Sequence, residues 1–204
     1  MKIKTMTLLI FAFTIFSCSD DDGERRSEPV SGSNLIAMPI PDGGNPINSP
    51  IEITQLMKIK DPSKVTVVVN LDHTFCGDLV VELVAPNGTA TALVKRLGVA
   101  SSGGFGSAAN FSSANALSFN SKNETGIVFE GLVTSDVIAA GDYAPTGGGQ
   151  DVVPQMAVVQ PLEQFLANKD VSGQWKLRVQ DHGNADIGTL VGWRLEFAAG
   201  ALKE

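Results

Sequence analysis

Residues 71–94, LDHTFCGDLVVELVAPNGTATALV, decide the fold class because they predict a strand, a tight turn and a returning strand. Side chains alternate along a strand, so Leu79 and Leu83 fall on one face and Glu82 on the other. In residues 86–88, proline sets φ for the first corner of a type I turn, asparagine suits the second, and glycine takes the left-handed position of a bulged hairpin. The stretch therefore predicts a β-hairpin within an all-β fold.

Further strands are predicted on both sides of the hairpin. Residues 65–71, VTVVVNL, have the pattern of a well-buried strand, and residues 173–181 and 188–197 alternate more clearly still. In the last two strands the residues expected to point inward are Trp175, Leu177, Val179, Val191, Trp193, Leu195 and Phe197. Both tryptophans are therefore predicted to lie in the core.

The chain between the hairpin and the last two strands is less regular. Residues 98–125 predict a long loop with strand fragments, and residues 127–133 predict a short strand. Three phenylalanines are expected to pin the long loop to the fold: Phe105, Phe111 and Phe119. Residues 141–145 and 147–149 are expected to break the strand pattern. Residues 161–168 predict one helical turn, since apolar residues recur at i, i+3 and i+4 after a proline.

Composition and charge restrict the class of protein. The chain has 204 residues, of which 43% are hydrophobic and 6% aromatic, and this allows one sizeable core. Its 21 glycines and 10 prolines favour an all-β domain with many turns. The net charge of −7 and the pI near 4.8 exclude a nucleic-acid partner, which requires a basic face.

The first residues indicate export. Two lysines precede the apolar residues 6–16, a run too short to span a bilayer and typical of a signal peptide. Residues 15–18, IFSC, resemble a bacterial lipobox, which implies a lipoprotein signal peptide over residues 1–17 and lipid attachment at Cys18. Residues 19–22, SDDD, resemble the acidic surface-export signal of lipoproteins in one group of Gram-negative bacteria. We therefore expect an exported outer-membrane lipoprotein that faces the cell exterior. The alternative is an ordinary secretory signal followed by an incidental cysteine.

The mature chain is expected to divide into two parts. Residues 18–36 are polar and charged and lack apolar periodicity, which predicts a flexible acidic tether, and residues 37–204 are expected to form the folded domain. If Cys18 carries lipid, Cys76 is the only other cysteine, so the domain holds no internal disulfide. Cys76 is predicted to be a small, partly buried apolar side chain at the start of the hairpin.

No catalytic site is recognisable in the sequence. The two histidines, His73 and His182, directly follow Asp72 and Asp181, but adjacent residues of an extended chain diverge, so neither pair forms a ready dyad. Both histidines are predicted to be surface or turn residues. The chain also lacks a Gly-x-Ser-x-Gly elbow and an H-E-x-x-H zinc pattern. We therefore predict that the protein is not an enzyme.

Calcium is the one cofactor that the sequence leaves open. Residues 181–188, DHGNADIG, place the carboxylates of Asp181 and Asp186 in a tight turn, and hard cations favour such oxygen ligands. The segment does not match the EF-hand spacing. The alternative is that aspartate, asparagine and glycine stand here as turn formers.

Six segments occur in the order that is found in one protein family: residues 77–79, 85–89, 141–145, 162–165, 172–181 and 188–195. With them, residues 40–198 resemble the P domain (P/Homo B domain) of proprotein convertases and of many bacterial secreted proteases. The residues that carry the family pattern here include Asp78, Trp175, Asp181 and Trp193. The resemblance implies a jelly-roll-like antiparallel β-sandwich, similar to galactose-binding domains, with one short helical turn. It also implies a module that follows a protease catalytic domain and stabilises it.

The resemblance also implies a protein partner. We expect a non-catalytic, surface-anchored lipoprotein that contacts the membrane through its lipid and acts as a protein-interaction or protease-accessory module. One alternative is participation in proteolysis as a domain associated with serine endopeptidases. Another is carbohydrate binding, which jelly rolls often support. Because both tryptophans are expected to point inward, the sole tyrosine, Tyr143, is the residue on which a sugar platform would depend.

Overall fold

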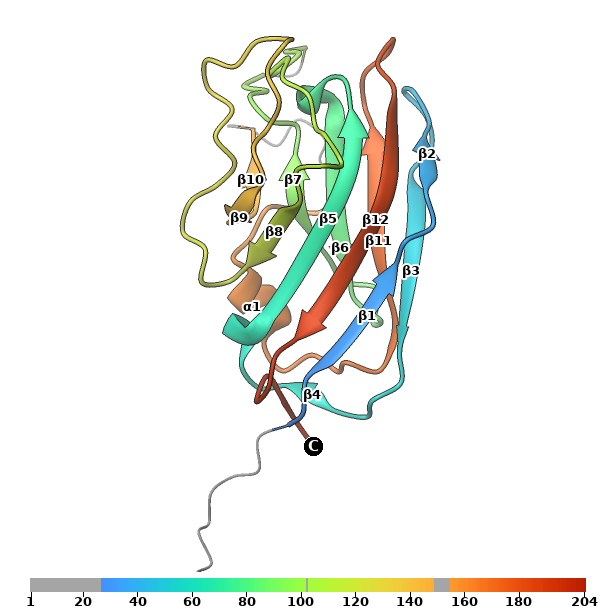
Figure 1. Ribbon diagram of the computed structural model, residues 1–204, viewed down its shortest axis with the longest axis vertical. Helices are drawn as coiled ribbons and strands as arrows, with labels where there is room; N and C mark the ends of the chain where they lie inside the picture. Colours follow the sequence, from blue (N-terminus) through green and yellow to red (C-terminus); the bar gives the residue numbers. More distant parts are fainter. Residues whose placement is uncertain (1–26, 102, 149–154) are drawn as a thin grey trace, which may run out of the picture.

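Two β-sheets lie face to face in the computed structural model, which describes residues 27–101, 103–148 and 155–204 (Figure 1). The first sheet has the order β1 (Val30–Asn34), β12 (Gly188–Phe197), β5 (Val65–His73), β8 (Leu117–Asn120) and β9 (Gly141–Tyr143), and β2 (Met38–Ile40) also pairs with β12. The second has the order β10 (Thr146–Gly147), β7 (Ala90–Lys95), β6 (Leu79–Val84), β11 (Gly173–Asp181) and β3 (Ile47–Ile53). The long central pairings are antiparallel, and the short outer strands β9 and β10 run parallel to β8 and β7. The predicted jelly-roll-like β-sandwich is confirmed.

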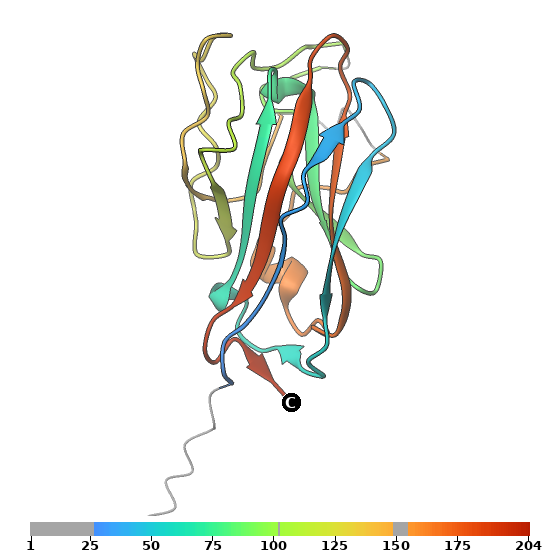
Figure 2. The same cartoon turned by 45° about the vertical axis from the view of Figure 1, so that its right-hand side comes forward.

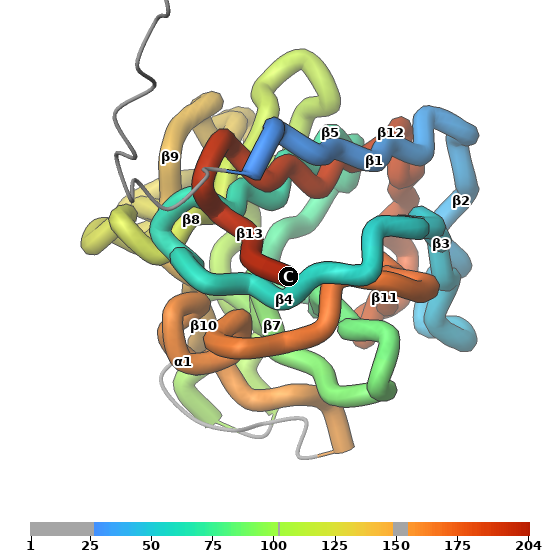
Figure 3. The backbone as a smooth tube through the Cα atoms, turned by 90° about the horizontal axis from the view of Figure 1, so that it is seen from below, coloured from blue at the N-terminus to red at the C-terminus, as the bar shows by residue number. Residues whose placement is uncertain are grey.

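The two ends of the sandwich differ. At one end β4 (Lys58–Ile59) and β13 (Leu202–Lys203) form a two-stranded sheet, with α1 (Leu162–Leu166) and the 3-10 turn η1 (Pro62–Lys64) nearby (Figures 1 and 3). Ser27 lies there too, since its carbonyl oxygen accepts a hydrogen bond from the Gly200 N–H at 2.9 Å. We call this the terminal end. The opposite end carries residues 41–46, 74–78 with the 3-10 turn η2 (Cys76–Asp78), 96–101, 103–112, 128–139 and 182–187, and we call it the loop end (Figure 2).

Both tryptophans lie in the core, as predicted. Trp175 and Trp193 are each 0% exposed, and each buried indole N–H has an acceptor, Val171 O at 2.8 Å and Ser49 Oγ at 3.1 Å respectively. Trp175 meets Phe197 edge to face, with 6.5 Å between the ring centroids. The core therefore gains two large apolar rings without leaving an indole donor unpaired.

The predicted hairpin forms as β6 and β7, and Gly88 has the expected left-handed backbone, with φ of +82°. β6 is buried on both of its faces because residues 156–158 cross the outer side of the second sheet. Ala92 N–H donates to Val158 O there at 3.1 Å, and Met156 packs on Val80. The single helical turn is likewise confirmed, since α1 buries its apolar side chains.

β1 closes one edge of the sandwich. It pairs with β12 and passes so close to β3 that a Cβ on Gly32 would lie 2.2 Å from Ile51 Cγ2. Asn34 Nδ2 donates to Pro50 O at 2.9 Å and so occupies a carbonyl group on the edge strand β3. Proline is tolerated at position 50 because an edge strand need not donate on its outer side.

The folded part begins earlier than predicted. The sequence predicts a flexible tether over residues 18–36, but residues 30–34 form β1, so placing the start of the domain at residue 37 is wrong. The polar sequence VSGSN is held by backbone pairing with β12, which no apolar alternation reveals. Residues 1–26, with the expected signal peptide and Cys18, lie outside the described residues. No helix within the described ranges is long and apolar enough to cross a membrane.

Parts of the irregular middle region also differ from the prediction. Residues 127–133 form no strand, and residues 141–143, expected to break the strand pattern, form β9. Phe111 and Phe119 are buried and pin the long loop to the fold, whereas Phe105 is exposed. The prediction of three anchoring phenylalanines is therefore correct for two of them.

A β-bulge in β12 reverses one predicted side-chain direction. The register shifts between Leu190 and Gly192, so Leu190 is buried and Val191 points outward. The other residues that were predicted to point inward from β11 and β12 are buried, among them Leu195 and Phe197.

Candidate functional site

Four titratable side chains meet at the loop end, each positioned by a different element. His73 ends β5, Asp181 ends β11, Asp78 ends η2, and Arg96 directly follows β7. His73 Nε2 lies 3.2 Å from Asp181 Oδ2, and Arg96 Nη2 lies 3.4 Å from Asp78 Oδ1. The side chains of His73 and Asp181 are 0% exposed and that of Asp78 is 6% exposed. We call these four residues the polar cluster.

The polar cluster contradicts the prediction that both histidines are surface or turn residues. The alternation along β5 turns His73 inward and leaves its sequence neighbour Asp72 exposed, so the adjacent pair indeed diverges. His73 instead pairs with Asp181, which is 108 residues away in sequence and belongs to the opposite sheet. His182 is half-buried in the turn after β11, and its Nε2 has no hydrogen-bond partner among the described residues.

The His73–Asp181 pair is built to hold the two sheets together. The other ring nitrogen of His73, Nδ1, lies 3.1 Å from the Phe75 backbone nitrogen, so both ring nitrogens are engaged within the protein. Asp181 also accepts a hydrogen bond from the Gly183 N–H at 2.8 Å. A general base needs a ring nitrogen within reach of a substrate proton, and this buried imidazole offers none.

Asp78 has an environment that favours its neutral form. Burial, and next the neighbouring Asp181 carboxylate, raise the pKa of Asp78 to about 6, although Arg96 acts in the opposite direction. The carboxylate leaves no room for a side chain at Gly183, where a Cβ would lie 2.0 Å from Asp78 Oδ2. The backbone also ties the two segments together, because His182 N–H donates to Asp78 O at 2.9 Å.

Arg96 joins the hairpin to η2. Its Nε donates to Gly77 O at 2.9 Å while its Nη2 reaches Asp78. The residue has φ of +45°, in the left-handed region that is costly for a side chain with a Cβ. The two side-chain contacts offset that cost and keep the cation largely away from solvent.

The calcium candidates Asp181 and Asp186 are not brought together into a ligand set. Asp181 is engaged by His73 and Gly183, and Asp186 Oδ1 accepts from Thr74 Oγ1 at 2.8 Å. Within residues 27–101, 103–148 and 155–204, the structure contains no group of three or more histidine, cysteine, aspartate or glutamate side chains that could hold a metal ion. The turn of residues 181–188 is thus held by one internal hydrogen bond and by bonds to His73, Thr74 and Asp42.

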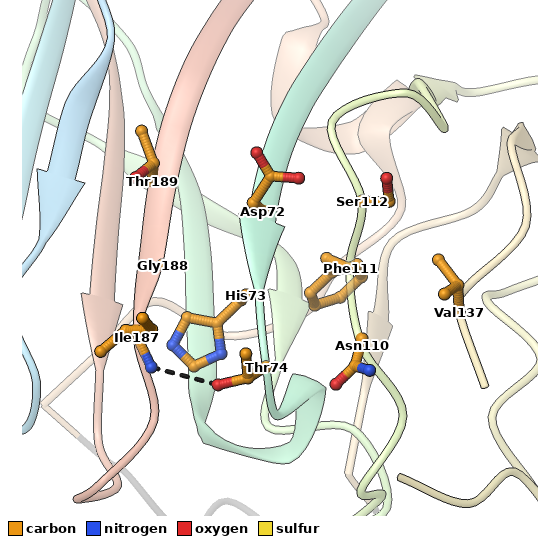
Figure 4. Close-up of a pocket in the computed structure, with 10 residues that line it drawn as sticks. All are labelled: Asp72, His73, Thr74, Asn110, Phe111, Ser112, Val137, Ile187, Gly188 and Thr189. Carbon is orange, nitrogen blue, oxygen red and sulfur yellow. Dashed lines mark hydrogen bonds between the residues drawn. The ribbon is translucent and has the colours of Figure 1, made fainter. Parts of the chain in front are cut away.

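A hollow of about 430 Å³ lies between β5, the start of β12 and residues 110–112, and His73 of the polar cluster is one of the residues that line it (Figure 4). Asp72 and Thr74 line it from β5 and the residue that follows, and Val137 and Ile187 stand at its sides. Asp72 Oδ1 accepts from the Ser113 N–H at 2.7 Å. The hollow is open and mixed in character, with carboxylate and hydroxyl groups next to exposed aliphatic side chains.

Glu82, which the strand pattern places on the face opposite Leu79 and Leu83, is a second buried charge, and its burial was not predicted. Its carboxylate accepts from Arg178 Nε and from the Ala157 backbone N–H, and its side chain is 0% exposed. Glu82 thereby fixes residues 156–158 over the second sheet. The signal was present, because a single glutamate inside the apolar run LVVELV requires a partner if both faces of the strand are buried.

The remaining candidate side chains are engaged in the fold. Cys76 is fully buried, more completely than predicted, and burial raises the pKa of its thiol. Tyr143 donates its hydroxyl proton to Ala139 O at 2.8 Å, and burial raises its pKa. Of the four residues of the family pattern, Trp175 and Trp193 lie in the core, and the two aspartates belong to the polar cluster.

Comparison with known proteins gives matches of three kinds. The family model of the proprotein convertase P-domain matches residues 62–124 and 156–197. The transglutaminase-activating metalloprotease of Streptomyces mobaraensis is 30% identical over 164 residues, which are 80% of this chain and 14% of that protein. A solved serine protease of Aeromonas sobria in complex with its chaperone has a TM-score of 0.40 and 16% identity, over 88% of this chain and 28% of that one. A further solved structure of a serine protease of Aeromonas sobria has a TM-score of 0.39 and 15% identity, over 87% of this chain and 28% of that one. The chain thus spans a small part of the length of each matched protein.

Proposed function

The chain belongs to the proprotein convertase P-domain family, and from this premise we propose that it is a non-catalytic interaction module that acts as an accessory to a protease. P domains are associated with proteases, and the matched relative from Streptomyces mobaraensis is by name a metalloprotease. The chain corresponds to 14% of the length of that relative, so the relative's named activity bears on this chain only through the proposal.

The observation that carries the proposal is the internal use of the polar cluster. His73 and Asp181 have no exposed side-chain surface, and both ring nitrogens of His73 are engaged by the fold. His73 lines the hollow, but both of its ring nitrogens are used within the fold, so the pair stabilises the loop end. What the loop end offers to another molecule is its exposed surface, which suits an interaction module.

We further infer that the protein is exported and anchored by a lipid on Cys18 at the outer membrane, facing the exterior. The lipobox-like IFSC sequence supports this anchor. Ser27 lies at the terminal end, so a chain that runs from Cys18 to Ser27 attaches the domain at that end and leaves the loop end free to face away from the membrane. Cell fractionation of the wild type and Cys18→Ala tests the anchor. The wild type is expected in the membrane fraction and the variant in the soluble fraction, and equal distributions would contradict lipid attachment.

Photo-crosslinking on intact cells tests the accessory function. The full chain carries a photoreactive residue in place of Ile187 at the loop end or of Leu56 near the terminal end, both strongly exposed positions. We expect a protease among the captured proteins that is absent when the cells are not irradiated. The protease should then be inactivated more slowly on heating when the purified chain is added. Capture of unrelated abundant surface proteins from both positions would contradict the proposal.

A separate experiment tests whether the chain itself has protease activity. Purified full chain is incubated with unfolded casein, and we expect no cleavage, because the buried His73 cannot reach a peptide bond. Cleavage that persists after rigorous purification and disappears in His73→Ala would overturn the non-catalytic assignment.

A further inference from the structure

The loop end exposes four large apolar side chains, which come from three of its segments. Phe105 is 78% exposed, Val133 58%, Val137 44% and Ile187 71%. Val137 and Ile187 stand on opposite sides of the hollow in Figure 4, and Val133 lines a neighbouring hollow formed by residues 98, 106–108 and 129–134. Exposed apolar side chains gathered at one end of a soluble domain are typical of an interaction surface.

The same end is acidic. Its exposed or half-exposed carboxylates are those of Asp42, Asp72, Glu130, Asp136 and Asp186. None of these five forms an ion pair with a residue in the described part of the chain, and their recorded partners are backbone N–H groups and the Thr74 hydroxyl. The two cations of this end that the structure describes are little exposed, with Lys95 at 5% and the Arg96 side chain at 14%. The surface therefore combines uncompensated negative charge with apolar groups.

The loop end is also held in place before any partner arrives. Ile187 N–H donates to Thr74 Oγ1 at 3.1 Å, and the same hydroxyl donates to Asp186 Oδ1 at 2.8 Å. Val133 N–H donates to Asp136 Oδ2 at 2.8 Å, and Asn110 N–H to Asp136 O at 2.9 Å. Val133, Val137 and Ile187 thus each sit beside a fixed carboxylate. A preformed surface of this kind loses little conformational entropy on binding.

We propose that the loop end docks a partner polypeptide segment in which lysine or arginine alternates with aliphatic side chains. The aliphatic groups pack on Ile187 and Val137, and the cations pair with the carboxylates of Asp72 and Asp186. Charge complementarity selects this occupant over an anionic membrane or a nucleic acid, both of which the five carboxylates repel. The inference rests on the proposed function, since it specifies the chemistry of the surface through which the accessory module holds its partner.

Fluorescence anisotropy with two labelled peptides tests the proposal on the full chain. One peptide alternates lysine with leucine over about twelve residues, a length that gives several lysine–leucine pairs along an extended segment. The other peptide has glutamate in place of every lysine. We expect saturable binding of the lysine peptide, at least about tenfold tighter than that of the glutamate peptide, and weakening by added salt. Absence of saturable binding of the lysine peptide overturns the inference.

Matched variants locate the binding site. Ile187→Ser and Asp72→Asn change exposed side chains of the loop end, so each is expected to fold and to weaken binding of the lysine peptide about fivefold. Leu56→Ser and Glu163→Gln make the same kinds of change away from the loop end and should leave binding unchanged. If all four variants bind alike, the loop end is not the docking surface. If photo-crosslinking captures a protease through position 56 and not through position 187, the proposed function stands and this inference falls.

Discussion

Replacement of Asp78 by asparagine should make the protein more stable near neutral pH, although it removes a charge that faces Arg96. Burial raises the pKa of Asp78 from 3.8 to about 6, a difference worth roughly 3 kcal/mol between its two protonation states. The folded chain therefore holds this proton more tightly than the unfolded chain. The resulting stabilisation is complete below pH 3.8 and is lost as the pH rises through about 6.

Asparagine resembles the neutral carboxyl group and keeps an Oδ1 acceptor for Arg96, so Asp78→Asn should not show this loss. The free energy of unfolding of the variant minus that of the wild type should rise by about 2 kcal/mol between pH 4 and pH 7. Urea unfolding followed by tryptophan fluorescence at several pH values measures this difference. Glu124→Gln removes an exposed carboxylate and is the control, with a difference that stays flat. A flat difference for Asp78→Asn as well would refute the assignment of a buried, proton-binding carboxylate.

Three further predictions concern packing and reactivity. Gly32→Ala should destabilise the fold by about 1–3 kcal/mol, because the new methyl group meets Ile51, and an unchanged melting temperature would show that the two sheets are not closely packed at this edge. Glu82→Gln should cost about 3 kcal/mol in urea unfolding, since it leaves the Arg178 cation without its buried carboxylate; a loss below about 1 kcal/mol would mean that the pair behaves as a surface ion pair. Cys76 should react with iodoacetamide only after unfolding, because it is 0% exposed and burial raises its pKa, and rapid alkylation of the native protein would contradict that burial.

Local patterns in the sequence predicted the elements whose structure depends on their own residues. The hairpin follows from Gly88 and the alternation around it, and the buried tryptophans follow from the alternation of β11 and β12. Each of these features depends on the residues of a single strand or turn and on which of its faces is covered. A window of about ten residues is therefore enough to predict it.

The sequence patterns did not predict features that depend on a partner far away in the sequence. β1 forms because β12 supplies its hydrogen bonds, and the His73–Asp181 pair forms because β5 and β11 end at the same end of opposite sheets. The bulge at Val191 is invisible to a strict period of two. The sequence identified Asp78 and Asp181 through family resemblance, but the burial that gives Asp78 its unusual pKa depends on segments that meet only in the folded chain.

The position of β1 has a mechanical consequence. It runs from the terminal end toward the loop end and pairs with β12 over five residues, from Val30 with Phe197 to Asn34 with Trp193. A force applied at Ser27, with the loop end held by a partner, acts along the axis of β1. The hydrogen bonds between β1 and β12 lie perpendicular to the strands and therefore to this force. All the bonds then bear the load together in shear, instead of opening one after another as in unzipping. A domain tethered in this way should resist flow or a moving partner with more force than its equilibrium stability suggests.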